Sequence, residues 1–308
     1  MLERIQKYRR DLHQIPELEL ELPKTQRYVQ ETLRDLPCTL SSPIPSSVVA
    51  FFDAGRKESI AFRSDMDALP VTEATGRAFA SRHAGRMHAC GHDGHMAMLL
   101  EFAHQLSTYY KELPHNVVLI FQPGEETPGG AEPMCKSGIF EQYHIKRIFG
   151  FHVWPMLDNG VIATRRNEFM ARSSEVNIDI TGKSAHAAKY QEGIDAMEIA
   201  ARYLLDLYTM EQEELSAETY RLLRFGLLKS GTVRNVVANA ARMEGTLRAF
   251  QDETYQYLKK RMLELAKPYE EQGAVFSFDI NTGYPAVMND AALVDQVRKL
   301  DPNIVLLE

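Results

Sequence analysis

The stretch Met87-His-Ala-Cys-Gly-His-Asp-Gly-His95 places three imidazoles, a thiol and a carboxylate within nine consecutive residues. Packing of a hydrophobic core does not explain such a cluster of polar side chains. Cys90 and His92 are separated by one glycine, so a sharply bent backbone can turn both side chains toward one point, as a metal site requires. Residues 96–106 are rich in helix formers, so His92 and His95 are predicted to share one face of a first helical turn. Because histidine is the commonest metal ligand, the cluster favours a metal site over a helix start with exposed imidazoles.

The bulk composition is that of a soluble globular protein. The chain has 308 residues, of which 44% are hydrophobic and 25% charged, enough for two domains and a large core. A net charge of −7 leaves no basic footprint, so neither nucleic acid nor an anionic membrane is expected as a partner. Three scattered cysteines and the lack of a signal-peptide pattern indicate a cytoplasmic protein. No apolar run approaches the ~20 residues needed to cross a bilayer.

Asp65 and Asp67 follow a predicted strand at 60–63, which is expected to form a hairpin with a strand at 48–52. Side chains two residues apart on a strand share a face. Two carboxylates that point the same way repel each other unless a cation or a proton lies between them. By itself the pair fits turn-capping aspartates equally well, and the nearby cluster around Cys90 shifts the balance toward a metal site.

Two further strand ends carry polar residues. The apolar run 116–121 is typical of a strand covered on both faces, and it leads to Glu125 and Glu126. Ligands of open α/β sheets lie beyond strand ends, so one glutamate could bind metal while the other handles protons, although a solvated loop pair is the common alternative. A strand at 147–151 leads to His152. Mixed nitrogen, oxygen and sulfur ligands thus converge at one sheet edge, which favours a two-metal hydrolase.

A second domain is expected where the sequence pattern changes, near residues 166–173. Its order is strand 174–181, helix 194–214, strand 221–228, strand 241–250, helix 252–272 and strand 274–281. This β-α-β-β-α-β order predicts a four-stranded antiparallel sheet with two helices on one face. We therefore divide the chain into the N-terminal part of a first domain at 1–168, a second domain at 169–284, and a return to the first domain at 285–308.

The sequence resembles the M20 metallopeptidases, and within them the amidohydrolase branch of aminoacylases, hippurate and auxin-conjugate hydrolases and N-acetyldiaminopimelate deacetylases. The resemblance covers nearly the whole chain through segments 9–17, 63–70, 87–95, 121–126, 150–153, 182–186 and 244–248. It implies an α/β fold with a zinc-aminopeptidase-like catalytic domain built on a mixed central sheet. It also implies an inserted α+β lid domain, through which two copies of the chain would form a homodimer.

The resemblance further implies roles for individual residues in the catalytic domain. Cys90, His92, Glu126 and His152 would be ligands of two divalent metal ions. Glu125 would be the general base and acid. Asp67 would support the ligands from behind, and Asp65 occupies a position where some relatives place a ligand.

In the lid domain, the resemblance implies that His186 reaches the carbonyl oxygen of the substrate, often across a dimer interface. Asn235 and Arg248 would contact the substrate carboxylate. The implied reaction is hydrolysis of the N-acyl bond of an N-acyl amino acid by metal-activated water. N-acetyldiaminopimelate is one candidate substrate, because residues 128–134 are similar to those of such deacetylases.

The donor set bears on which metal is expected. Thiolate and imidazole suit zinc, cobalt or nickel, whereas carboxylates also accept manganese, so Mn or Zn is expected, with Co or Ni also compatible. A structural zinc site is the alternative, but such sites usually take four Cys or His ligands, and this set is rich in carboxylates.

One departure from the family pattern concerns the C-terminal end. Relatives complete the metal site with a further histidine, preceded by a Gly-Glu-Asp-Phe type segment, whereas this sequence has no histidine after His186 and stops at Glu308. The expectation is a chain that lacks part of its catalytic domain, as a fragment or as a natural truncation. The alternative function is a catalytically inactive relative that binds metal or forms dimers.

Overall fold

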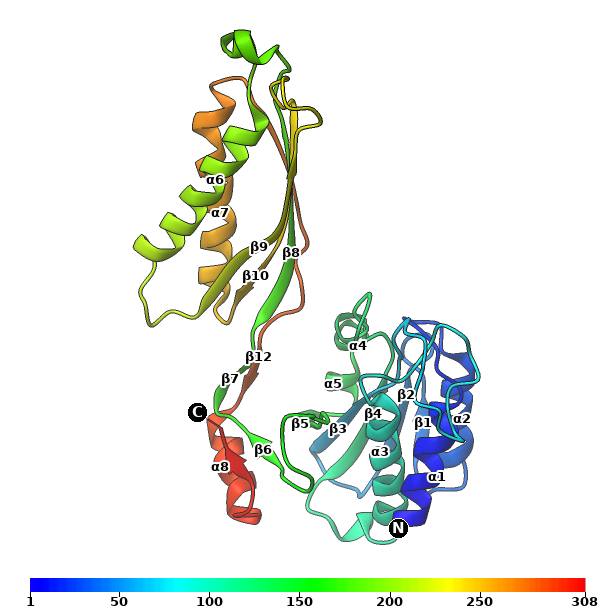
Figure 1. The fold of residues 1–308 in the computed structure, drawn as a ribbon. Helices are drawn as coiled ribbons and strands as arrows, with labels where there is room; N and C mark the ends of the chain where they lie inside the picture. Colours follow the sequence, from blue (N-terminus) through cyan, green and yellow to red (C-terminus); the bar gives the residue numbers. More distant parts are fainter. Residues whose placement is uncertain (308) are drawn as a thin grey trace. The chain divides into compact units, whose positions relative to one another are not determined.

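The computed structural model describes residues 1–307, and the chain divides into two compact units, Met1–Leu157 and residues 158–308. The expected fold class is confirmed. The first unit has a mixed sheet with helices, and the second contains a four-stranded antiparallel sheet with two helices (Figure 1). The predicted domain boundary near residue 168, and the assignment of 285–308 to the catalytic domain, stay predictions.

The first unit is built on a five-stranded sheet of order β1-β2-β4-β3-β5. Its strands are β1 (Thr39–Ser41), β2 (Val48–Phe52), β3 (Ser59–Asp65), β4 (Asn116–Gln122) and β5 (Ile145–Gly150). Its helices are α1 (Leu2–His13), α2 (Pro23–Leu33), α3 (His92–Leu106), α4 (Ala131–Lys136) and α5 (Ile139–Gln142), with a 3-10 turn η1 (Tyr110–Glu112). β3 runs parallel to β4 and β5, whereas β1–β2 and β2–β4 are antiparallel.

The predicted hairpin between 48–52 and 60–63 is wrong. β4 lies between these strands, antiparallel to β2 and parallel to β3. All of β4 is buried, so it needs a strand on each side to satisfy its backbone. The Asn116 side chain, at the start of β4, accepts hydrogen bonds from the backbone N–H groups of Ala54 and Arg56. That contact holds the β2–β3 connection across the end of β4.

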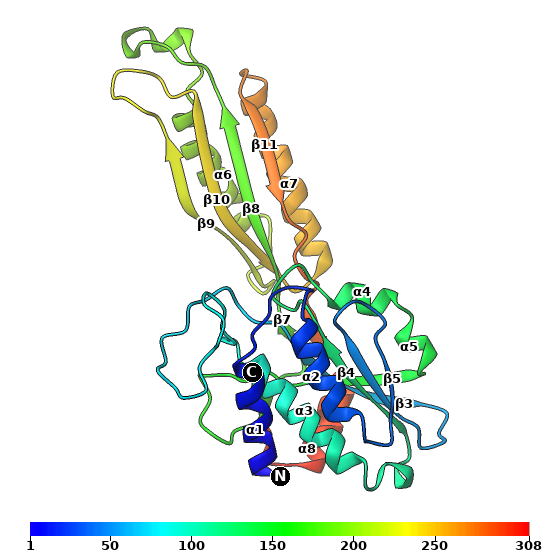
Figure 2. The same ribbon diagram turned by 90° about the vertical axis from the view of Figure 1, so that its right-hand side faces the viewer.

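The side chains of β4 alternate between two hydrophobic cores. Val117, Leu119 and Phe121 pack with α1, α2 and α3, and Val118 and Ile120 pack with the segment containing α4 and α5. Helices therefore cover both faces of the sheet, as Figures 1 and 2 show for this unit. This two-sided burial explains the continuous apolar run in the sequence.

Two helices of the first unit have well-defined starts. α2 begins with Pro23, whose missing N–H does no harm in a first turn. The Glu17 carboxylate accepts the N–H groups of Lys24 and Thr25 at 3.0 and 2.9 Å, which caps this helix from outside. α3 begins at His92, so His92 and His95 fall in its first turn, as predicted.

The second unit contains the predicted β-α-β-β-α-β arrangement. Its elements are β8 (Arg172–Thr181), α6 (Ala196–Glu213), β9 (Arg221–Ser230), β10 (Ala240–Ala249), α7 (Asp252–Glu270) and β11 (Val275–Ile280), with a 3-10 segment η2 (Ala187–Glu192). The sheet order is β11-β8-β10-β9, and all pairings are antiparallel. One face of this sheet packs against α6 and α7 around Ile178, Tyr203 and Met262. We call these elements the lid domain.

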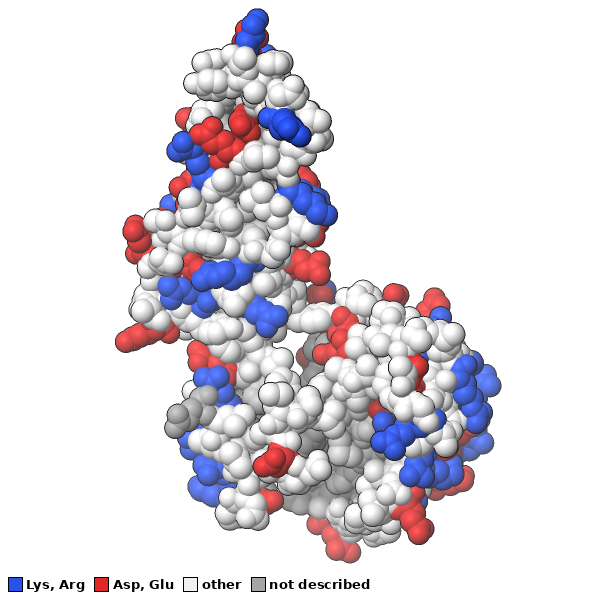
Figure 3. Space-filling model, viewed as in Figure 1, with Lys and Arg blue, Asp and Glu red and all other residues white. Residues whose placement is uncertain are grey.

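Two short strand pairings connect the first residues of the second unit with its last residues. β6 (Ala163–Thr164) pairs with β13 (Val305–Leu306), and β7 (Asn167–Met170) pairs with β12 (Val287–Asn289). α8 (Ala291–Leu300) lies between β12 and β13 in the chain. Among residues 1–307, no helix combines the length and apolarity needed to span a membrane. Lysine and arginine lie among aspartate and glutamate side chains on the face shown in Figure 3.

Candidate metal centre

Side chains from the start of α3 and from three strand ends meet in the first unit. They form two groups in which the possible ligand atoms all lie within 4.8 Å of one another. One group is Cys90, His92 and Glu126, and the other is Asp65, His92, His95 and His152. His92 belongs to both groups. The structure therefore places the four residues that the sequence suggested as ligands in these two groups, and Asp65 and His95 lie beside them in the second group.

The ring of His92 is oriented for ligation. Its Nδ1 donates to the backbone carbonyl of Asp67 at 2.8 Å, so in the neutral ring Nε2 carries a lone pair. That Nε2 is buried without a hydrogen-bond partner among the described residues. Carboxylate oxygens of Asp65, Glu126 and Glu125 lie 3.6, 3.8 and 3.9 Å from it. A lone pair surrounded by carboxylates is an arrangement that a divalent cation stabilises, so the donor set fits a metal ion.

Asp67 ties two of the converging segments together. Its Oδ1 accepts the N–H of Glu125 at 2.8 Å, and its Oδ2 accepts the N–H of Glu126 at 3.0 Å. Its backbone carbonyl holds His92. Asp67 is fully buried, so these bonds are shielded from water. One residue thus positions the glutamate loop relative to α3.

Asp65 and His95 form a second support. His95 Nδ1 donates to Asp65 Oδ1 at 2.7 Å, and His95 Nε2 accepts the N–H of Val153 at 2.9 Å. Arg63 donates to Asp65 Oδ2 at 2.8 Å. Although burial opposes it, the contacts with His95 and Arg63 hold the pKa of Asp65 below its usual range. His95 anchors the segment that carries His152, a role the sequence signalled only through the spacing of His95 from His92.

Cys90 and His152 face each other, with Sγ and Nε2 3.5 Å apart. Burial, together with the neighbouring Glu126, raises the pKa of the Cys90 thiol to about 12. At neutral pH such a thiol ionises when a cation lies beside it, since the thiolate is the ligand form. Cys90 is therefore suited to bind a metal ion within its group with His92 and Glu126 rather than to act as a free nucleophile.

Glu125 lies beside His92 without belonging to either ligand group. Burial raises the pKa of Glu125; the nearby His92 ring acts in the opposite direction, and the charge of Asp65 adds to the increase. A carboxylate whose pKa is raised holds a proton more readily than an exposed one, so it is suited to accept and return a proton.

The lid residues named from the sequence fall at two places. His186 forms a bridge with Val236, and the N–H of Ala187 donates to the carbonyl of Asn235 at 3.0 Å, so His186 and Asn235 lie together at one end of the lid domain. Arg248 is near the other end of β10, paired with Ser173 and Leu222. His186, Asn235 and Arg248 are all exposed. The structure thus joins two of these residues and separates the third.

A sheet whose strand ends carry nitrogen, oxygen and sulfur donors, in a chain with a separate α+β domain, defines a two-unit metallohydrolase architecture. Comparison with known proteins identifies the family. Residues 61–301 match the model of peptidase family M20/M25/M40. The chain belongs to this family, and it is a hydrolase.

Two relatives illustrate the similarity in sequence. The N-acetyldiaminopimelate deacetylase of Lacticaseibacillus casei is 36% identical over 319 residues, covering 97% of this chain and 81% of the relative. An uncharacterized hydrolase of Staphylococcus epidermidis is 36% identical over 298 residues, covering 95% of this chain and 77% of the relative.

Two solved structures share the fold. A structure from methicillin-resistant Staphylococcus aureus has a TM-score of 0.92 at 29% identity, covering 99% of this chain and 82% of the other. The YXEP protein of Bacillus subtilis, described as a dinuclear metal binding peptidase of family M20, has a TM-score of 0.81 at 29% identity, covering 99% of this chain and 81% of the other.

Proposed function

We propose that this protein is a metal-dependent amidohydrolase that cleaves the N-acyl bond of an N-acyl amino acid. The observation that carries the proposal is the position of Glu125, whose carboxylate lies 3.9 Å from Nε2 of His92, the residue shared by both ligand groups. A proton-transferring carboxylate beside a metal-binding cluster is the arrangement that hydrolysis of an amide needs.

Each residue of the centre has a part in this reaction. Cys90, His92, Glu126 and His152 would hold two divalent ions, with Asp65 and Asp67 fixing them from behind. Bound ions would supply the Lewis acidity that polarises the acyl carbonyl and acidifies water. Glu125 takes the proton of the attacking water and delivers it to the leaving nitrogen. Manganese or zinc suits the mixed donor set, and cobalt or nickel is also compatible with it.

One relative and the polar residues of the lid domain support an N-acyl amino acid as the substrate class. The relative at 36% identity named N-acetyldiaminopimelate deacetylase makes that acylated amino acid the first substrate to test. Arg248 and Asn235 would bind the free carboxylate, and His186 would donate to the acyl oxygen.

The geometry of the lid domain favours a homodimer in which two copies build each site. Along β10, Ala240 and Arg248 are about 27 Å apart at roughly 3.4 Å per residue. Asn235 precedes Ala240, the first residue of β10, and lies beside His186. An N-acyl amino acid is on the order of 10 Å long, so it cannot reach both ends of one lid. His186 and Asn235 of one copy would therefore act with Arg248 of the other.

The decisive experiment compares Glu125→Gln with Glu126→Gln in the full chain loaded with Mn²⁺ or Zn²⁺. Metal content is measured by elemental analysis, and release of free amine from N-acetyldiaminopimelate and a panel of N-acetyl amino acids gives the rate. Glu125→Gln is expected to lower kcat by about 10²- to 10⁴-fold at unchanged metal content. Glu126→Gln is expected to lose metal as well as activity.

Two results would count against the proposal. Full turnover by Glu125→Gln would show that Glu125 is not the general base. Metal binding by the wild-type chain with no turnover on the whole panel would favour the inactive metal-binding relative.

A further inference from the structure

A buried ion pair links α1 to the start of α3, behind the metal centre. Nδ1 of His13 lies 2.7 Å from Oδ2 of Asp93, and Nε of Arg9 lies 2.9 Å from the same oxygen. His13 is 2% exposed and Asp93 1%, so the pair is closed to solvent. These residues lie in segments 9–17 and 87–95, two of the segments through which the sequence resembles the M20 family. His13, Arg9 and Asp93 have no part in the proposed chemistry.

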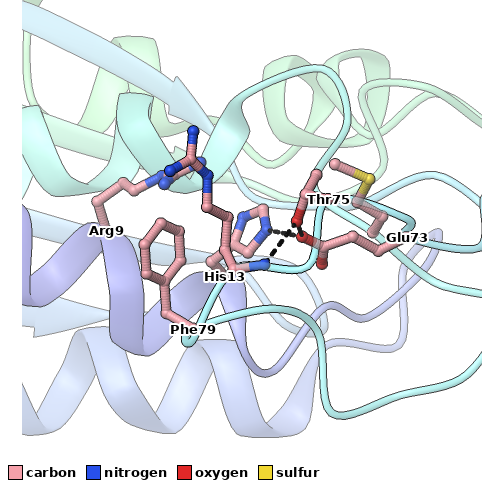
Figure 4. A pocket seen from close by; sticks show the side chains of 7 residues that line it. Arg9, His13, Glu73, Thr75 and Phe79 are labelled. Atoms are coloured by element: carbon pink, nitrogen blue, oxygen red, sulfur yellow. Dashed lines mark hydrogen bonds and ion pairs between the residues drawn. The ribbon is translucent and has the colours of Figure 1, made fainter.

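The second ring nitrogen of His13 also has a carboxylate partner. Its Nε2 lies 3.2 Å from Oε1 of Glu73, whose Oε2 accepts the N–H of Ser81 at 2.6 Å. Figure 4 shows the His13–Glu73 contact beside the ring of Phe79, which meets the His13 ring edge to face at 5.8 Å. Carboxylates only accept, so both ring nitrogens of His13 donate. The ring therefore cannot rotate without breaking a buried, charge-assisted bond.

Asp93 connects His13 to the proposed ligands, because it is hydrogen-bonded to His13 and is next to His92 in the chain. It directly follows His92 in the first turn of α3, and its Oδ1 accepts the N–H of Gly94 at 2.9 Å. Successive helical residues point about 100° apart, so Asp93 faces α1 while His92 faces the carboxylates of the centre. Any shift or rotation of this turn that relaxed Asp93 would move Nε2 of His92, and Cys90 just before it, by a similar amount.

We propose that His13 is a positioning residue of the metal centre, which fixes the first turn of α3 through its bond to Asp93 and so sets the places of His92 and Cys90. This inference rests on the proposed function, because it takes those two residues as ligands. A metal site tolerates displacements of only about 0.5 Å in its ligands, so an anchor of this kind affects affinity.

The two ring nitrogens of His13 allow a matched pair of variants. In His13→Asn the amide nitrogen takes the place of Nδ1, which keeps the bond to Asp93 and loses the one to Glu73. In His13→Gln the amide nitrogen takes the place of Nε2, which keeps Glu73 and loses Asp93. Both variants lose one buried bond and the ring charge, so both are expected to lower the unfolding temperature of the metal-free chain.

Cobalt(II) alone is the probe, because a bound Cys90 thiolate gives a charge-transfer absorption that reports its coordination without any turnover. His13→Gln is expected to raise the Kd for Co²⁺ about 10- to 100-fold and to weaken that band. His13→Asn is expected to stay within about threefold of the wild type. Tyr8→Phe is the control, since it removes the hydrogen bond of 2.8 Å between α1 and His104, at the far end of α3.

The outcomes are distinct. Wild-type-like cobalt binding by His13→Gln, or equal losses in both His13 variants, would overturn the positioning role while leaving the proposed metal centre intact. A wild-type chain that binds no Co²⁺ would overturn the metal centre and this inference together. Selective loss in His13→Gln, with Tyr8→Phe unaffected, supports the inference.

Discussion

The backbone carbonyl of Asp67 accepts a hydrogen bond from Nδ1 of His92 at 2.8 Å. This contact, between residues 25 positions apart, leaves Nε2 of His92 as the nitrogen that faces the surrounding carboxylates. The carboxylate of the same aspartate holds the backbone of Glu125 and Glu126. Asp67 therefore organises the centre without needing to touch a metal ion.

Asp67→Asn tests this arrangement. An amide has one accepting oxygen, so one of the two backbone N–H groups at 125 and 126 loses its acceptor. Metal affinity is expected to fall about 10- to 100-fold, as for other partners that orient ligands. Competition with a chelator measures the change. The matched control is Asp53→Asn, because Asp53 is exposed and accepts one backbone bond, from Gly55. Equal affinities of the two variants would contradict the role of Asp67.

Gly91→Ala tests the bend that precedes α3. Gly91 has a φ of +90°, and an added Cβ would lie 2.6 Å from Cγ2 of Val153, next to His152. The left-handed backbone costs about 1–2 kcal/mol for alanine. The collision adds about 1–3 kcal/mol. Denaturant unfolding should show both losses.

Two companion variants separate the contributions to the Gly91→Ala effect. Gly85 also has a positive φ, of +74°, but nothing lies within 4 Å of its added Cβ. Gly85→Ala is therefore expected to show the backbone cost alone. Adding Val153→Ala to Gly91→Ala should restore part of the stability, because it removes the colliding methyl group. No recovery in the double variant would contradict the steric account.

Mixing of inactive variants tests the two-copy site. His186→Ala and Arg248→Ala are each expected to be inactive. If each site takes His186 from one copy and Arg248 from the other, half of the sites in a mixed dimer are intact. Subunit exchange should then restore about one quarter of wild-type activity in a symmetric dimer at equal mixing. Absence of any recovery, with subunit exchange demonstrated by mass spectrometry, would place both residues in one copy.

The Arg4–Glu101 pair predicts a pH dependence of stability. Arg4 donates twice to Glu101, at 2.7 Å each, and Gln105 donates once more. The Arg4 contact lowers the pKa of Glu101 to about 2 from an ordinary 4.5. A lowered folded pKa contributes stability above pH 4.5, which is lost as the pH falls toward 2.

Glu101→Gln should therefore lower the free energy of unfolding by about 1.5 kcal/mol at pH 7. The difference from the wild type should shrink between pH 4.5 and 2. Urea titrations across this range provide the measurement. Glu132→Gln, which changes an exposed pair with Lys136, is the control and should show no measurable change. A difference that stayed constant with pH would rule out the ionised pair as its cause.

Much of the architecture was predictable because it depends on local patterns. The wholly apolar run at 116–121 indicated a central strand, and the β-α-β-β-α-β order from residue 174 onward indicated the lid sheet. The Cys90-Gly-His92 spacing pointed to a metal site, since neighbouring donors are visible in the sequence itself. The polar residues after three strands pointed to the edge where Asp65, Glu126 and His152 come together.

The remaining features depend on contacts between distant segments, which no local pattern encodes. β4 lies between β2 and β3 because a fully buried strand needs two neighbours, and this replaced the expected hairpin. The bond from His13 to Asp93 joins residues 80 positions apart. The sequence by itself determined which donors the protein has and on which elements they lie. Only the tertiary structure decided which nitrogen of His92 faces the centre, because hydrogen bonds from other segments set the orientation of a ring.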